Sequence, residues 1–279
     1  MKIIDAHLHY RPDYAPFAAT AAISGHDYSA AAIQALMKET GICHGIVMGN
    51  FDPDPQNQQY PPYLSFCVGL DSNTFRVEDI KTLTWKVEEN LKRPSCVGLK
   101  LYPGYNPFYV TDELYTPFLR LAQKYQKPVA IHTGAVAATK QGSLLKYSHP
   151  LTVDELAVRY PDVTFILCHF GNPWLCDAAA VAEKNKNVAI DLSGILEGQF
   201  DAETFFASHQ LYFQTIQMWL DYIGSYDRMM FGTDFPIVNV PAYVALWKKL
   251  LPQEVWEDVF FHNAVRIYGL DLTKKGAML

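Results

Sequence analysis

Two histidines near the start of the chain have the spacing of metal ligands. His7 and His9 lie in the segment MKIIDAHLHY, and residues two apart on a strand point to the same face. Two imidazoles at one level of a sheet can share one cation. An HxH pair alone has little specificity, so a metal site requires further nitrogen or carboxylate groups from elsewhere in the chain.

Suitable groups end several other apolar runs. Lys100 lies in GLKLYP, His132 in PVAIHTG, His169 in FILCHFG and Asp234 in FGTDFP. Each residue alone has an ordinary structural explanation, such as a hydrogen-bonded core histidine or a turn aspartate. Gathered at the ends of separate strands, they predict one active site.

Eight short β-rich runs alternate with segments of helical length. Most are too apolar for a sheet with one face in water, which is typical of strands buried on both faces. Eight such strands predict an α/β protein with a (β/α)8 TIM-type barrel, in which catalytic groups lie at C-terminal strand ends. The G-x-G-x-x-G turn of an open doubly wound sheet is absent after the first strand. The expected strands are residues 2–8, 43–49, 64–70, 96–102, 128–134, 163–170, 187–194 and 227–234.

Capping signals predict where several helices begin and end. Ser29 is expected to cap a helix over residues 30–40, with Gly41 after its end. Thr152 and Glu155 form a T-x-x-E capping box for a helix over 153–160. Residues 10–28 are expected to form a long irregular loop over the C-terminal face of the barrel, where the insertion 195–208 also lies. Further helices are expected at 76–92, 112–125, 174–185, 209–223, 240–250 and 252–261.

Length and composition exclude several classes of protein. The 279 residues fit one barrel domain over 1–279, and 49% hydrophobic residues supply a packed core. A net charge of −6 without a basic run argues against nucleic-acid binding. Five scattered cysteines without a CxxC pair indicate a reducing compartment, so a cytoplasmic location is expected. No membrane span or signal peptide is expected, because apolar runs are short and the chain opens on a strand.

The ligand types favour a catalytic over a structural metal site. His7, His9, His132 and Asp234 supply nitrogen and carboxylate ligands and leave a position for water. Zn²⁺ suits these ligands best, with Mn²⁺ or Fe²⁺ as alternatives. Such an ion lowers the pKa of a bound water toward about 7 and polarises a carbonyl group.

Seven motifs, taken in order along the chain, resemble those of the amidohydrolase superfamily. They are IDAHLH, GLKLYP, PVAIHTG, FILCHFG, VAIDLSG, FGTDFP and HNAVRIYGL. The chain looks most like the branch that contains aminocarboxymuconate-semialdehyde decarboxylase, from residue 3 to about 270. The resemblance implies a distorted TIM-type barrel with one or two divalent metals. It assigns His7, His9, His132 and Asp234 to a single ion. It also makes His169 an acid/base or substrate contact, and Asp234 the proton acceptor from the attacking water.

Lys100 leaves the number of ions open. In binuclear members of the superfamily a lysine on this strand is carboxylated and bridges two metals, and His132 and His169 would then bind the second ion. In mononuclear members Lys100 could pair as an ammonium with a substrate carboxylate, or form a salt bridge inside the barrel. Lys100 and Gly98 share a strand face, so Lys100 points inward if Gly98 does.

Supporting and substrate-binding residues are expected nearby. Asp5, two residues before His7, should hydrogen-bond within the barrel, and Asp191 should contact substrate or support His169. Candidates for substrate binding at the rim are Arg11, Lys100, Tyr102 and Trp174.

The site predicts a metal-dependent hydrolase of a small amide, lactone or ester. Asp234 would accept the proton of water, and His169 or the metal would stabilise the oxyanion. One alternative is a non-oxidative decarboxylase of a small unsaturated or aromatic acid, which the resemblance supports. The other is a non-catalytic metal-binding barrel. A small-molecule substrate is the expected partner, and the aromatic-rich composition permits a homodimer.

Overall fold

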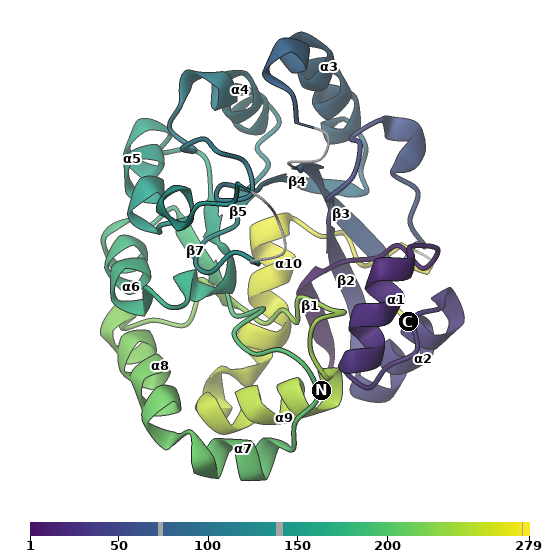
Figure 1. Cartoon of the computed structure of the whole chain (residues 1–279), viewed down its shortest axis with the longest axis vertical. Coiled ribbons are helices and arrows are strands. Elements are labelled where there is room, and N and C mark those ends of the chain that lie inside the picture. Colours follow the sequence, from purple (N-terminus) through teal and green to yellow (C-terminus); the bar gives the residue numbers. More distant parts are fainter. Residues whose placement is uncertain (72–74, 138–141, 275) are drawn as a thin grey trace.

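The computed structural model describes residues 1–71, 75–137, 142–274 and 276–279 (Figure 1). Eight strands follow one another around a single sheet in chain order, and each pairs in parallel with its chain neighbour. The (β/α)8 prediction is therefore confirmed. The strands are β1 (Ile3–Leu8), β2 (Ile42–Met48), β3 (Leu64–Leu70), β4 (Cys96–Leu101), β5 (Val129–Ile131), β6 (Phe165–Leu167), β7 (Val188–Asp191) and β8 (Met229–Met230).

The segment that follows β8 closes the barrel against β1. The amide of Ala6 donates to the carbonyl of Phe231 at 2.9 Å, and the amide of Asp234 donates to the carbonyl of His7 at 2.7 Å. The amide of His9 donates to the carbonyl of Phe235, also at 2.7 Å. These hydrogen bonds hold the segment after β8 next to β1. The first and last segments of the barrel therefore lie side by side at His7 and His9.

Helices connect the strands and surround the barrel (Figure 1). Buried side chains form an outer cluster between strands and helices and an inner cluster within the barrel. The C-terminal helix contributes Ala264 and Tyr268 to the inner cluster. The α-helices are α1 (Ala15–Ile23), α2 (Ala30–Thr40), α3 (Ile80–Leu91), α4 (Thr116–Lys124), α5 (Leu151–Arg159), α6 (Leu175–Lys184), α7 (Ala202–Ser208), α8 (Gln210–Ile223), α9 (Val240–Leu250) and α10 (Asn263–Tyr268). None of the described helices is long and apolar enough to span a bilayer.

The capping predictions have mixed outcomes. The Ser29 hydroxyl accepts a hydrogen bond from the amide of Ala32, and Gly41 adopts a φ of 79° after α2, as predicted. The capping box at Thr152 is wrong, because α5 begins at Leu151 and Thr152 lies inside it. The Thr152 hydroxyl instead donates to the carbonyl of His149 at 2.8 Å.

Two helices lie where the sequence predicted none. The expected loop over 10–28 contains α1, whose alanine-rich sequence buries only Ala21 and so shows no apolar stripe. The insertion 195–208 contains α7, which Asp201 caps through a hydrogen bond to the amide of Thr204. The expected helix 252–261 is part of a longer helical run that continues to the end of α10 at Tyr268.

The ends of β2 and β3 approach so closely that neither can carry a side chain there. A Cβ on Gly69 would lie 1.4 Å from the carbonyl oxygen of Gly49. That oxygen also accepts a hydrogen bond of 2.9 Å from the hydroxyl of Tyr102. The two glycines therefore set the position of one wall of the barrel mouth.

We predict that Gly69→Ala destabilises the fold by at least about 3 kcal/mol, because the backbone of β2 must move. Gly198→Ala is a suitable control, since that position has a φ of 76° and no atom within 4 Å of an added Cβ. It should cost only about 1 kcal/mol of backbone strain. Urea unfolding measures both values, and equal losses would contradict this explanation.

Candidate active site

Three ligand atoms converge at the C-terminal mouth of the barrel. His7 Nε2 lies 3.3 Å from Asp234 Oδ1, and His9 Nε2 lies 3.0 Å from the same oxygen. All three residues offer ligand atoms within 4.8 Å of one another. With metal–ligand bonds of about 2.0–2.2 Å, neighbouring ligands of a tetrahedral ion lie roughly 3.3–3.6 Å apart, and the observed 3.3 and 3.0 Å lie at or slightly below this range. The spacing therefore fits one small divalent cation.

The other nitrogen of each histidine is held by the barrel. His7 Nδ1 donates to Asp191 Oδ2 at 2.8 Å, and His9 Nδ1 donates to the carbonyl of Met48 at 3.0 Å. These contacts orient both rings with Nε2 toward Asp234. Carboxylate or carbonyl partners of this kind fix the tautomer and orientation of metal-binding imidazoles.

Asp234 reaches the histidines from an unusual backbone conformation. Its φ is 60°, a left-handed value that is uncommon for residues other than glycine and that clusters at functional sites. Its Oδ1 atom is buried and has no hydrogen-bond partner of good geometry within the described chain, while the Nε2 atoms of His7 and His9 lie within ion-pair distance of it. Gly194 leaves the necessary room, because a Cβ there would lie 2.9 Å from Asp234 Oδ2 and 2.6 Å from His169 Nδ1. A buried carboxylate oxygen without a hydrogen bond, facing two imidazole nitrogens, is what a cation would satisfy.

His132 and His169 form a second pair beside this group. His132 Nε2 donates to the carbonyl of Ala135 at 2.9 Å, which leaves Nδ1 to accept from His169 Nε2 at 3.1 Å. His169 Nδ1 then lies 4.0 Å from Asp234 Oδ2. The structure thus brings three of the four predicted ligands together, while His132 contacts them through His169. The role of His132 as a ligand stays a prediction.

Asp5 and Asp191 support the site as expected. Asp5 accepts hydrogen bonds from the amide of His7 at 3.1 Å and from the hydroxyl of Thr233 at 2.6 Å. Asp191 Oδ1 accepts the amide of His169 at 3.0 Å, in addition to the contact of its other oxygen with His7. The Asp191 carboxylate therefore links the group of His7, His9 and Asp234 to the pair of His132 and His169.

Burial and neighbouring charges set the protonation states. Burial alone would raise the pKa of Asp234, but His7 beside it holds that pKa well below its usual range. Burial alone would lower the pKa of His7, but the negative charge of Asp191 outweighs the effect of burial and raises that pKa well above its ordinary value. Burial lowers the pKa of His169 to about 4 and that of His132 well below its ordinary value. His132 and His169 are therefore neutral near pH 7.

Lys100 points into the barrel, as predicted, and is fully buried. Its Nζ donates to Cys168 Sγ at 2.9 Å and lies 5.1 Å from the centre of the Tyr102 ring. No carboxylate of the described residues lies within ion-pair distance of this ammonium, so the predicted alternative of an internal salt bridge is wrong. A buried cation that contacts only a thiol and a ring is expected to find an anion elsewhere.

A cavity of about 370 Å³ opens over these groups. Asp71 is a lining residue that the sequence analysis missed, although it directly follows β3 and thus occupies a strand end. Trp174, a predicted substrate contact, is not among the lining residues; its ring packs against His149 at 4.8 Å between centroids. The lining residues are His7, His9, Phe17, Asn50, Asp71, Lys100, Tyr102, Tyr105, His132, His169 and Asp234.

The model of the amidohydrolase family, Amidohydro_2, matches residues 4–270. The chain belongs to the amidohydrolase family. The match confirms the resemblance that the ordered motifs indicated, and it places the chain in a metal-dependent family. The solved structures that share its fold include proteins named as a hydrolase and as decarboxylases. No curated protein sequence matches this chain.

Solved structures share the fold over nearly the whole chain at low identity. A 2,6-dihydroxybenzoate decarboxylase from Rhizobium has 17% identity and a TM-score of 0.68, covering 97% of this chain and 99% of that one. A probable 2-pyrone-4,6-dicarboxylic acid hydrolase from Acinetobacter baumannii has 16% identity and a TM-score of 0.60, covering 97% of this chain and 100% of that one. A 5-carboxyvanillate decarboxylase from Novosphingobium aromaticivorans, complexed with manganese, has 13% identity and a TM-score of 0.64, covering 96% of each chain. The shared fold does not select one reaction.

We predict that Asp191→Asn weakens Zn²⁺ binding about 10- to 100-fold, because His7 loses the carboxylate that orients and polarises it. Ser193→Ala is the control, since the Ser193 hydroxyl donates to Asp191 Oδ1, whereas His7 is bound by Oδ2, and no hydrogen bond joins Ser193 to His7 within the described chain. Competition against a chromophoric chelator measures both affinities. Equal Zn²⁺ affinity in Asp191→Asn and the wild type would show that this contact is not needed.

Proposed function

We propose that this protein is a metal-dependent hydrolase that cleaves an amide, lactone or ester in a small substrate bearing a carboxylate. The observation that carries the proposal is the convergence of two imidazole nitrogens on a buried carboxylate oxygen without a hydrogen bond, at the floor of a cavity of about 370 Å³. The cavity has the size of a small-molecule site.

His7, His9 and Asp234 would hold the ion in this proposal. Nitrogen and carboxylate ligands favour Zn²⁺, and Mn²⁺ or Fe²⁺ are alternatives. The bound ion supplies a Lewis acid that polarises the substrate carbonyl and makes water easier to deprotonate.

Asp234 and His169 would transfer the proton of the attacking water. Asp234 turns Oδ1 toward His7 and His9, which leaves Oδ2 on the side of His169. We assign Oδ2 as the acceptor of the proton from the attacking water. His169 Nδ1, at 4.0 Å from that oxygen, would receive the proton and return it to the leaving group.

Lys100 would bind the carboxylate of the substrate. It lines the cavity, is fully buried and has no acidic partner among the described residues. A substrate carboxylate would supply the missing charge, and Tyr102 would flank it. This assignment takes Lys100 as an ammonium and the site as mononuclear, rather than Lys100 as a carboxylated bridge between two ions.

Decarboxylation is the second candidate, because two of the three solved structures described above are named as decarboxylases of aromatic acids. The same ligand group and Lys100 would then orient the carboxylate that is lost as CO₂. The two reactions differ in their products, since only hydrolysis adds the elements of water to the substrate.

We predict that turnover in ¹⁸O-labelled water by the metal-loaded protein places one ¹⁸O atom in the product. The screen would use small lactones, esters and amides that carry a carboxylate, together with aromatic acids, and mass spectrometry would read the label. Release of CO₂ without ¹⁸O in the organic product would replace hydrolysis with decarboxylation.

We predict that Lys100→Met raises KM for a carboxylate-bearing substrate about 10- to 100-fold, the range of a lost hydrogen bond to a charged group of about 1.5–3 kcal/mol. The methyl ester of that carboxylate should lose much less, because it offers no charge to Lys100. Steady-state kinetics on the acid and its ester measure the difference. A comparable loss for both would assign Lys100 a role other than carboxylate binding.

A further inference from the structure

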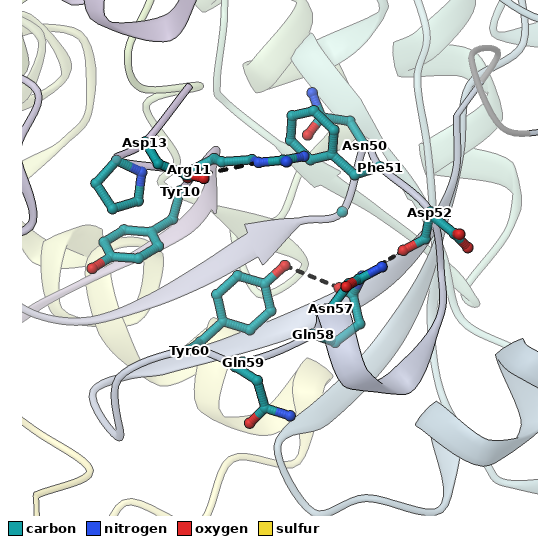
Figure 2. Close-up of a pocket in the computed structure, with 12 residues that line it drawn as sticks. Tyr10, Arg11, Asp13, Asn50, Phe51, Asp52, Asn57, Gln58, Gln59 and Tyr60 are labelled. Atoms are coloured by element: carbon teal, nitrogen blue, oxygen red, sulfur yellow. Dashed lines mark hydrogen bonds and ion pairs between the residues drawn. The ribbon is translucent and has the colours of Figure 1, made fainter. Parts of the chain in front are cut away.

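A second cavity, of about 540 Å³, adjoins the first. Asn50 lines both cavities, so the second is next to the candidate metal site. Figure 2 shows its walls, which come from the loop after β1 and from the segment that follows β2. Residues 10–13 form the first wall, and residues 49–52 and 57–60 form the second.

Arg11 is held in this cavity by an aromatic ring and not by hydrogen bonds. Its guanidinium carbon lies 4.0 Å from the centre of the Phe51 ring, across which the side chain extends in Figure 2. Within the described chain its guanidinium donates no hydrogen bond, and its nearest acid is Asp13, at 3.7 Å from Nε and 79% exposed to solvent. Stacking therefore orients the planar cation while its N–H groups remain available.

The other charges on the cavity wall do not compensate Arg11. Asp52 is paired with Lys86, whose Nζ lies 2.9 Å from Oδ1. Gln58 is committed on both sides, since it donates to the carbonyl of Asp52 at 2.9 Å and accepts from the hydroxyl of Tyr60 at 3.0 Å. Among the described residues that line it, the cavity thus presents one cation, Arg11, whose guanidinium donates no hydrogen bond. It lies next to aromatic rings that suit a planar or apolar part of a ligand.

Tyr28 ties Arg11 to the candidate metal site. Its hydroxyl donates to the carbonyl of His9 and accepts from the amide of Arg11, both at 3.0 Å. Tyr28 is buried, and its ring stacks on Phe235 in the segment that closes the barrel. One residue, Tyr10, separates Arg11 from His9, so their Cα atoms lie within roughly 7 Å of each other. The backbone of Arg11 is therefore held close to His9, one of the candidate metal ligands.

We propose that Arg11 binds a second carboxylate of the substrate, at the end remote from the reacting group. The substrate is then a small dicarboxylic acid that extends from the cavity over His7, His9 and Asp234 into the cavity of Arg11. A carboxylate matches the planar, two-donor edge of a guanidinium. The location of the reacting end rests on the proposed function, whereas the part of Arg11 is testable by binding alone.

The test is calorimetric titration of the Zn²⁺-loaded protein with pairs of acids that differ by one carboxylate. The pairs are glutarate with butanoate, adipate with pentanoate, and isophthalate with benzoate. We expect at least one diacid to bind about 10-fold or more tightly than its monoacid, in the range of one charge-assisted contact. Arg11→Met should abolish that preference and leave the affinity for the monoacid unchanged. Arg120→Met, the same change at an exposed position of α4, should preserve the preference.

Tyr28→Phe provides an independent variant, because it removes both hydrogen bonds but keeps the ring and the charge of Arg11. It should weaken the diacid preference without affecting the monoacid. A diacid preference that persists in Arg11→Met, or the absence of any preference in the wild type, overturns the proposal. If the preference depends on Arg11 but ¹⁸O is not incorporated from water, hydrolysis is rejected while the role of Arg11 stands.

Discussion

The closure of the barrel between the first strand and the segment after the last one is the constraint on which the site depends. Backbone hydrogen bonds from Asp234 to His7 and from His9 to Phe235, each of 2.7 Å, fix the two segments side by side. They bring a carboxylate from one end of the sequence against two imidazoles from the other. Because the contact is made by main chain, the fold itself positions these three side chains.

Several ionisable groups are buried at the mouth of the barrel, and burial of a charge costs free energy unless a partner compensates it. The structure supplies such partners to some of these groups and not to others. Asp191 is compensated by His7 and by the amide of His169. Asp234 Oδ1 faces two imidazole nitrogens without a hydrogen bond of good geometry, and Lys100 has no acidic partner within the described chain. An uncompensated carboxylate oxygen favours a cation, and an uncompensated ammonium favours an anion. These two features are the basis on which we propose a metal ion and an acidic substrate for this site.

The barrel and the gathering of the site were predictable from sequence because both follow from strand order. Apolar runs identified all eight strands, and a polar residue ending a parallel strand must lie at the same face as the others. The face of the sheet on which a side chain lies was predictable, as for Lys100, but the hydrogen-bond partner of that side chain was not. His132 turns Nε2 to the carbonyl of Ala135 and Lys100 reaches Cys168, and both depend on loops and rotamers that no spacing encodes. The helix α1 was missed because its alanine-rich sequence has no amphipathic pattern.

The most direct test of the account is the metal content of the purified wild-type protein and of two variants after dialysis against Zn²⁺ and removal of the free ion. Inductively coupled plasma mass spectrometry should find about one equivalent in the wild type and almost none in His9→Gln or Asp234→Asn, with the fold of both variants intact by circular dichroism. Two equivalents that require bicarbonate, or full retention of the ion by Asp234→Asn, would contradict a single ion held by His7, His9 and Asp234.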